Sequence, residues 1–416
     1  MSIYNFIGFA FFLGLVFILL GNTLFSCGVG LFNSYTLDTE LFLFDSLSYY
    51  LIILVFLLGC LSIFMLNSYL SGSVVFFLVL SLLFSCLCFC VNHSVLFWCF
   101  YELSMLPLLY LIFKESPYSE RFVAGWYFSV YLLVTSLPLI LCLLYLSVVN
   151  GSFLFTHWGP LSCPVILYVF LSFIFFTKVP LGPFHTWLPI VHAEATSIVS
   201  IFLSGYIMKL GLLGVYRCAS SIFNSNMYLY LFLCLILSIC FAVTASSELD
   251  GKRWLAFLSL SHIVIGFLSF YIGTWEGISL GFIFCLGHGL SAGLVFGVLW
   301  LFYDVTASRN WLLLKEGLTG KCLLFSLVIS LLSLCSFPPT LQFFCEVNLL
   351  AESTWCSVFL LFWCLYLFIG GLVPLVLCGS CVIRTEAVEF SCYNFYIFFM
   401  YFFALSIWCF CGIFLL

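Results

Sequence analysis

Residues 165–189, VILYVFLSFIFFTKVPLGPFHTWLP, form an apolar run that is interrupted by Lys178 and then by prolines. The run has the character of a membrane-spanning helix, but Pro180 and Pro183 interrupt it, because each proline removes a backbone N–H from the helix ladder. Non-helical backbone at membrane depth is tolerated only inside protein or beside water. The stretch therefore predicts a helical membrane protein with a polar path through it.

The composition of the whole chain agrees with this reading. Its 416 residues are 65% hydrophobic and 6% charged, with a formal net charge of -5 and a mean hydropathy of +1.30. Soluble chains carry roughly 25% charged residues. This difference excludes a soluble domain and makes nucleic acid and soluble substrates unsuitable partners.

Charged residues and turn formers divide the chain into thirteen apolar segments. The expected fold is therefore an all-α polytopic membrane protein with about 13 transmembrane helices. The expected spans are 3–20, 47–66, 74–91, 95–113, 124–148, 165–182, 193–216, 228–247, 254–272, 276–302, 322–350, 354–378 and 394–416. Residues 21–46 contain Asp38, Glu40 and Asp45 and are expected to form an extramembrane loop.

Basic residues predict the orientation, because loops on the cytoplasmic or matrix side are enriched in lysine and arginine. Eight of the 11 follow even-numbered spans: Lys114, Arg121, Lys252, Arg253, Arg309, Lys315, Lys321 and Arg384. Arg217 follows the seventh span, and Lys178 and Lys209 fall inside spans. We therefore expect the N-terminus on the positive side and the C-terminus on the opposite side.

A second interrupted span occupies a corresponding place, because the eleventh carries Pro338 and Pro339 ahead of Glu346. If spans 3 to 7 and 8 to 12 form two units, the broken span is the fourth of each, and the odd helix number inverts one unit relative to the other. The expected division is 1–72, N-terminal helices and loop; 73–217, first five-helix repeat; 228–378, second five-helix repeat; and 394–416, C-terminal helix. Inverted repeats with matching broken helices are typical of transporters with an ion path at the midplane.

Ionisable residues inside expected spans are few, and each costs about 2.5 to 3.5 kcal/mol on insertion scales. They are Glu102, Lys178, Lys209, His262, His288 and Glu346. Lysine and histidine give up protons readily when desolvated, whereas arginine does not, so the set indicates a lateral proton pathway. The alternative is a group of buried pairs that only fix helix packing. His262 in particular could simply donate to a carbonyl across a helix interface.

Metal and redox chemistry within the chain is not expected, because there is no GxGxxG motif after a strand and no set of paired CxxC motifs. Two groups have the residue types of metal ligands: Cys86, Cys88 and Cys90 with His93, and His185 and His192 with Glu194. The cysteines point to different faces of one helix and are interpreted as small hydrophobic residues. The second group flanks a Trp-Leu-Pro break, where capping of the loop is the simpler interpretation.

Several stretches together resemble a known family. The longest is 178–195, KVPLGPFHTWLPIVHAEA, and the others lie within 101–125, 250–262, 288–309 and 337–346. Over roughly residues 40–350 the chain is similar to the chain 4 family of NADH:ubiquinone oxidoreductase, or respiratory complex I. Chains 2 and 5 and the multisubunit cation/proton antiporters usually have lysine where this chain has Glu346, so the glutamate favours the chain 4 family.

The resemblance implies an antiporter-like, proton-translocating subunit of the mitochondrial inner membrane, with its N-terminus in the matrix and its C-terminus in the intermembrane space. Quinone reduction in other subunits would supply the energy. NADH, flavin, iron–sulfur clusters and quinone would bind those partners, so no cofactor is expected in this chain. The expected partners are the other membrane-arm subunits, including the homologous chains 2 and 5, and membrane lipid.

The resemblance also implies roles for the ionisable residues. Glu102 would pair with Lys178 and tune its affinity for a proton, Lys209 and His288 would relay protons, and Glu346 would release them. His262 is a further candidate.

The chain departs from the family in three ways. The helix that contains Glu102 is the fourth expected span, whereas in the family it is the fifth of fourteen. Thr196 stands where the family usually has proline, and Val305 stands where it has arginine. Two other functions stay open: a subunit of a secondary cation/proton antiporter, and a structural membrane scaffold.

Overall fold

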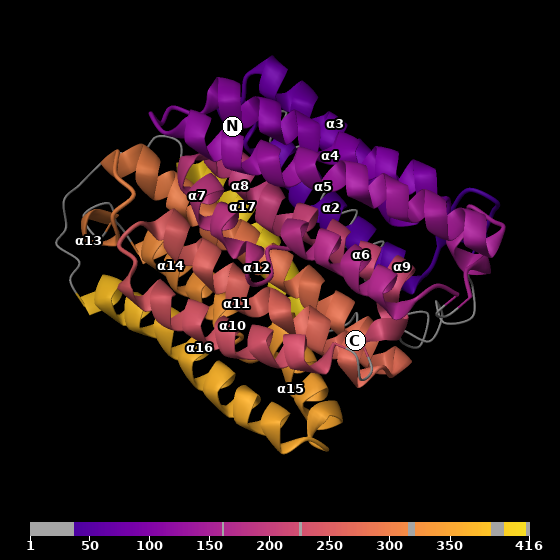
Figure 1. Cartoon of the computed structure of the whole chain (residues 1–416). Coiled ribbons are helices and arrows are strands. Elements are labelled where there is room, and N and C mark those ends of the chain that lie inside the picture. Colours follow the sequence, from indigo (N-terminus) through magenta and orange to yellow (C-terminus); the bar gives the residue numbers. More distant parts are fainter. Residues whose placement is uncertain (1–36, 160–161, 224–226, 315–320, 384–394, 413–416) are drawn as a thin grey trace.

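The computed structural model describes residues 37–159, 162–223, 227–314, 321–383 and 395–412. The expected span 3–20 and the basic residues Lys315 and Arg384 lie outside these ranges. The described part is a bundle of helices (Figure 1). One short antiparallel pair of strands, β1 (Leu37–Asp38) and β2 (Leu43–Phe44), lies in the segment that was expected to be a loop.

The helices follow the expected apolar segments closely. They are α2 (Ser46–Met65), α3 (Gly72–Cys90), α4 (Ser94–Glu115), α5 (Arg121–Asn150), α6 (Val165–Lys178), α7 (Trp187–Glu194), α8 (Ser197–Phe202), α9 (Met208–Ala219), α10 (Tyr228–Ser247), α11 (Gly251–Ile272), α12 (Trp275–Thr306), α13 (Trp311–Leu314), α14 (Lys321–Leu334), α15 (Leu341–Ser353), α16 (Ser357–Ile383) and α17 (Phe395–Cys411). A π-helical turn, η5 (Leu203–Ile207), joins α8 to α9.

Local sequence explains where many of these helices begin and end. The side chains of Asp45, Thr274 and Thr340 accept hydrogen bonds from backbone N–H groups in the first turns of α2, α12 and α15. Such caps satisfy donors that have no partner inside the helix. Gly151 and Gly273 end α5 and α11 in the left-handed conformation that glycine adopts without a steric penalty.

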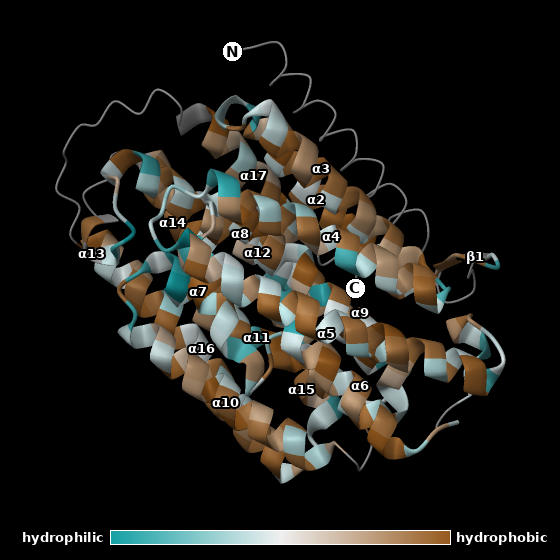
Figure 2. Cartoon of the chain, turned by 45° about the horizontal axis from the view of Figure 1, so that its top comes forward, coloured by the Kyte–Doolittle hydropathy of each residue, from teal (hydrophilic) through white to brown (hydrophobic). Residues whose placement is uncertain are grey.

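The helices form a membrane protein. Within the described ranges, nine helical segments are long and apolar enough to cross a bilayer. Hydrophobic residues cover most of the outer helix faces (Figure 2), and Val148, Ile166 and Phe368 are among the most exposed. Only lipid or neighbouring protein can cover such faces, so the expected class, an all-α polytopic membrane protein, is confirmed.

Helix α12 lies at the centre of the bundle. It contacts α2, α8, α11, α14, α15 and α17, and Figure 1 shows it between α3 at one edge and α16 at the other. Its Gly289 packs on the π-turn so closely that an added Cβ would lie 3.1 Å from the backbone oxygen of Gly205. Glycine at this position therefore sets the spacing between α12 and the π-turn.

The first broken span differs from the expectation in its extent. Helix α6 ends at Lys178, as Pro180 requires, but the chain resumes as α7 before the next helix starts at Ser197. The expected span 193–216 corresponds to the helical segment Ser197–Ile222, whereas the expected break at Trp187–Pro189 is wrong, because Pro189 lies in the first turn of α7 and not at a junction. Proline is tolerated there, since the first N–H groups of a helix have no intrahelical partner.

The second broken span lies at Phe337–Thr340 between α14 and α15. Here the expected single span 322–350 is two helices. Ser336 precedes the prolines with φ +53°, a conformation that costs a residue with a side chain about 1–2 kcal/mol. Residues are held in this way mainly at functional sites.

Candidate functional site

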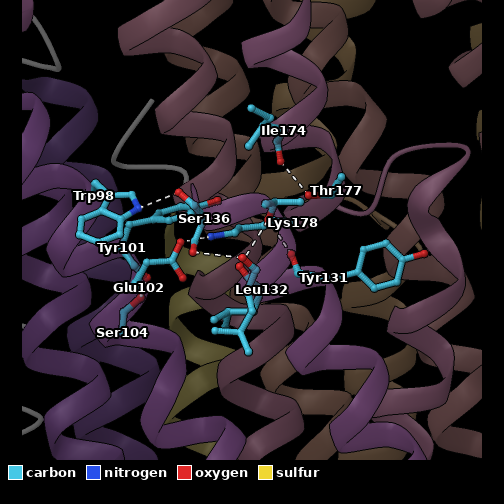
Figure 3. A network of polar contacts seen from close by, with 12 residues as sticks. Trp98, Tyr101, Glu102, Ser104, Tyr131, Leu132, Ser136, Ile174, Thr177 and Lys178 are labelled. Atoms are coloured by element: carbon cyan, nitrogen blue, oxygen red, sulfur yellow. Dashed lines mark hydrogen bonds and ion pairs between the residues drawn. The ribbon is translucent and has the colours of Figure 1, made fainter. Parts of the chain in front are cut away.

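Helices α4 and α6 bring Glu102 and Lys178 together. The Lys178 ammonium donates a hydrogen bond to Glu102 Oε1 and forms an ion pair with it, and the two side chains are 4% and 11% exposed. The ring of Tyr101 lies beside the ammonium, 4.1 Å from Nζ to the ring centroid, as Figure 3 shows. Within the described residues Glu102 Oε2 has no hydrogen-bond partner. The pair is therefore buried with one carboxylate oxygen free to accept a proton.

A small cavity of about 10 Å³ lies beside Lys178. Its wall includes Met105, Phe128 and Leu132, and Ile207 from the π-turn. A space of about 10–15 Å³ is the smallest that holds one water molecule, and that water needs polar partners. In the described ranges no hydrogen bond joins Lys178 to Lys209, so the Glu102–Lys178 pair is not hydrogen-bonded to the other titratable residues.

Lys209 and His288 meet where the π-turn faces α12. Lys209 Nζ lies 3.3 Å from His288 Nδ1, and it also donates to the backbone oxygen of Ser204. In an α-helix that oxygen would accept from Met208, but the Met208 N–H bonds Leu203 O across the π-turn. The π-turn therefore supplies a backbone acceptor for a lysine that is fully buried.

His262 and Glu346 are joined by a residue that the sequence analysis did not select. The hydroxyl of Tyr366 on α16 is hydrogen-bonded to His262 Nδ1 and donates to Glu346 Oε1 at 3.3 Å. Ser336, held in its left-handed conformation, donates to the same carboxylate oxygen at 2.9 Å. All four residues are buried. The second broken span thus places a serine and a carboxylate at one end of a polar chain.

Gln342 connects His262 to α12. Gln342 Nε2 lies 3.5 Å from His262 Nδ1, and Gln342 Oε1 accepts from Ser291 Oγ at 3.3 Å. The rings of His262 and His288 lie 5.4 Å apart between centroids. We call Lys209, His288, His262, Tyr366, Gln342, Glu346 and Ser336 the central network. It runs through α9, α12, α11, α16 and α15 and contains four of the six ionisable residues that the sequence selected.

A charged cluster lies at one end of the bundle, where α7 ends. Lys252 donates to the backbone oxygen of Ala195 at 2.8 Å, and Arg309 donates to that of Ala193. Arg309 Nη1 also lies 3.5 Å from Glu194 Oε1. Its Cζ lies 4.3 Å from the ring centroid of Tyr118, in the loop between α4 and α5. Burial raises the pKa of the Tyr118 hydroxyl, so the ring stays neutral. The connections that follow α4, α7 and α12 therefore meet the first turn of α11 on one side.

The two groups with the residue types of metal ligands do not converge within the described ranges. His192 is fully buried and stacks on Phe296, whereas His185 lies against Phe241 and Glu194 faces Arg309. In the other group, His93 Nδ1 accepts from the backbone of Leu96 at the start of α4.

Sequence reasoning missed Tyr366, Gln342 and Ser336. A tyrosine in an apolar helix carries no signal, because most such tyrosines pack as large hydrophobic residues. Ser336 precedes Pro338 by two residues, and that position next to a predicted break was the one signal available.

Comparisons with known proteins identify the family of the chain. Residues 91–371 match the family described as NADH:quinone oxidoreductase/Mrp antiporter, TM, and the range contains the Glu102–Lys178 pair and the central network. NADH-ubiquinone oxidoreductase chain 4 from Rhipicephalus sanguineus is 28% identical over 342 residues, which are 79% of this chain and 76% of the relative. The protein of that name from Ceratitis capitata is 30% identical over 322 residues, 74% of this chain and 71% of the relative.

The fold recurs in solved structures. A chain of respiratory complex I from Thermus thermophilus with bound NADH has a TM-score of 0.77 at 21% identity, covering 89% of this chain and 82% of that chain. At this identity the likeness shows a shared fold.

Proposed function

The chain belongs to the NADH:quinone oxidoreductase/Mrp antiporter family of membrane subunits, and we propose that it translocates protons as a chain 4 subunit in the membrane arm of NADH:ubiquinone oxidoreductase. The observation that carries the proposal is the central network, a buried series of titratable side chains from Lys209 to Glu346. Burying so many groups that can change charge is costly unless they act. A scaffold could pack the same helices with apolar residues.

The Glu102–Lys178 pair is the element that responds to the redox reaction. While the pair is closed, the ammonium is neutralised; when Glu102 takes a proton at its free oxygen Oε2, the ammonium loses its counter-charge and gives up its own proton. Lys209 and His288 receive a proton, His262 passes it on, and Glu346 is the terminal acceptor. No hydrogen bond joins Lys178 to Lys209 among the described residues, so the proton step between them needs a transient water.

Redox chemistry takes place in other subunits in this proposal. NADH, flavin, iron–sulfur clusters and quinone bind there, and this chain holds no cofactor. Its partners are membrane-arm subunits, including the homologous chains 2 and 5, and membrane lipid against the exposed apolar faces of α5 and α16.

The full topology is also a proposal. Thirteen spans, with two inverted five-helix repeats, account for the two broken spans, because α6–α7 and α14–α15 then hold the same place in each repeat. The location is the mitochondrial inner membrane, with the N-terminus in the matrix. The meeting of Lys252, Arg309 and Tyr118 at one end of the bundle supports the positive-inside orientation.

The proposal is tested in the whole enzyme, reconstituted in liposomes. Lys209→Met should lower the number of protons moved per electron, because it removes the buried ammonium next to His288. Lys114→Met is the matched control, since Lys114 is exposed at the end of α4. Equal proton-to-electron ratios in both variants would contradict the proposal.

The alternative, a subunit of a secondary cation/proton antiporter, makes a different prediction for the native protein. It should then purify in a small complex without flavin and exchange Na⁺ for protons without NADH. Purification within a flavin-containing complex supports the first function.

A further inference from the structure

Tyr366 lies between His262 and Glu346 in the central network. Its hydroxyl is bonded to both His262 and Glu346, and the Gln342 side chain also contacts both residues. The ring is fixed between Phe362 and Trp363, whose centroids lie 5.4 Å and 5.8 Å away. Trp363 is itself anchored by a 2.8 Å hydrogen bond from Nε1 to Ser353 Oγ on α15. The hydroxyl is therefore held in place from two sides.

A phenol has one hydrogen, so its two contacts depend on each other. If His262 Nδ1 carries a proton, it donates to the Tyr366 oxygen, and the hydroxyl donates to Glu346. If Nδ1 is unprotonated, it can accept from Tyr366, and the hydrogen bond to Glu346 is lost. Whether the Tyr366 hydroxyl donates to Glu346 thus depends on the protonation of His262.

Gln342 is a second possible donor to His262 Nδ1. Its Nε2 can only donate, and it lies 3.5 Å from His262 Nδ1, the same nitrogen that Tyr366 contacts. When Nδ1 is unprotonated, it can accept from either Gln342 or Tyr366, and the hydrogen bond from Tyr366 to Glu346 is lost only in the second case. When Nδ1 is protonated, only Tyr366 can accept its hydrogen.

We propose that the Tyr366 hydroxyl relays protons between His262 and Glu346, and this inference rests on the proposed function. The step starts with both nitrogens of His262 protonated and Glu346 ionised. The Tyr366 O–H bond breaks as its hydrogen bonds Glu346 Oε1, and the Nδ1–H bond of His262 breaks as its proton bonds the Tyr366 oxygen. Glu346 becomes neutral, His262 keeps its Nε2 hydrogen, and Tyr366 is again a phenol.

Tyr366→Phe in the intact complex tests the relay, because it removes one oxygen and keeps the ring. Coupled NADH oxidation should slow by about 10²-fold, the low end for a positioned proton-transfer group. Tyr401→Phe is the matched control. Tyr401 is also fully buried, and its hydroxyl donates to the backbone oxygen of Gly293 at 3.2 Å, away from the titratable residues.

A rescue separates relay from packing. Tyr366→His should restore part of the rate, because imidazole can accept and release a proton, whereas Tyr366→Asn should not. If Tyr366→Phe does not assemble, the comparison of these two variants decides. Equal rates in the His and Asn variants, or a native rate in Tyr366→Phe, would overturn the relay.

Glu346→Gln distinguishes this inference from the proposed function on which it rests. If Glu346→Gln is blocked while Tyr366→Phe pumps normally, only the relay is wrong. If Glu346→Gln itself pumps normally, the proposed exit is wrong as well.

Discussion

Replacing Glu102 by glutamine removes a charge from the most deeply buried ion pair of the described residues, and its effect can be bounded from the structure. The side chains of Lys178 and Glu102 are 4% and 11% exposed, so water cannot take over the role of the carboxylate. Removing one partner of a buried pair costs about 3–5 kcal/mol. At about 1.4 kcal/mol per factor of ten, this cost corresponds to a factor of about 10² to 4 × 10³ in an equilibrium constant.

Such a change leaves Lys178 in one protonation state throughout turnover. Glutamine keeps the shape of the side chain and its acceptor oxygen, so α4 and α6 should still pack. The assay is the complex in sealed liposomes, with NADH oxidation and proton uptake recorded together. We expect both to fall in Glu102→Gln, because a proton cannot leave or enter the pair.

Glu276→Gln is the matched control, because Glu276 lies exposed in the first turn of α12. It loses the same charge where screening by water makes its contribution about 0–1 kcal/mol. A normal proton-to-electron ratio in Glu102→Gln, with normal assembly on a native gel, would refute the argument that this pair controls proton transfer.

Three further predictions concern other parts of the chain. Glu346→Gln should block release and Glu346→Asp should keep part of it, measured as protons per electron; a native ratio in Glu346→Gln would make Glu346 a structural acid. Protease or tag accessibility should find the N- and C-termini on opposite sides of the membrane, and both ends on one side would show that the span count is wrong by one. Gly289→Leu should destabilise the subunit by about 1–3 kcal/mol, seen as a lower melting temperature, because the added carbon meets the backbone at Gly205. Gly371→Leu should not, since nothing lies within 4 Å of its Cβ position.

The sequence predicted the features that follow from backbone chemistry. Pro180 and Pro339 locate both broken spans, because each stands close to a second proline, and the loss of backbone donors there ends the helix, whereas single prolines such as Pro138 and Pro374 lie inside continuous helices. It also selected Glu102, Lys178, Lys209, His262, His288 and Glu346 by their cost in an apolar segment, and the structure brings all of them into the interior.

The rest depends on contacts between distant segments. The π-turn contains no proline, and Gly205 within it packs against Gly289 of α12, so no local sequence pattern predicts it. The resumption of helix at α7 was missed for a related reason: the tripeptide Trp187–Pro189 looks like a break until the hydrogen bond from Trp187 Nε1 to Thr177 O fixes it against α6. Tyr366 shows its role only when α16 is placed beside α11 and α15.

The cavity beside Lys178 bears on how well the membrane stays insulated when the enzyme is at rest. An unbroken file of hydrogen-bonded groups from Glu102 to Glu346 would conduct protons down the electrical gradient whether or not NADH is consumed. Met105, Phe128, Leu132 and Ile207 line the cavity together with Tyr131, Thr177 and Trp187, and it has room for about one water. In the proposed pathway the file is interrupted here, so the resting leak depends on these side chains as well as on the residues that carry the proton.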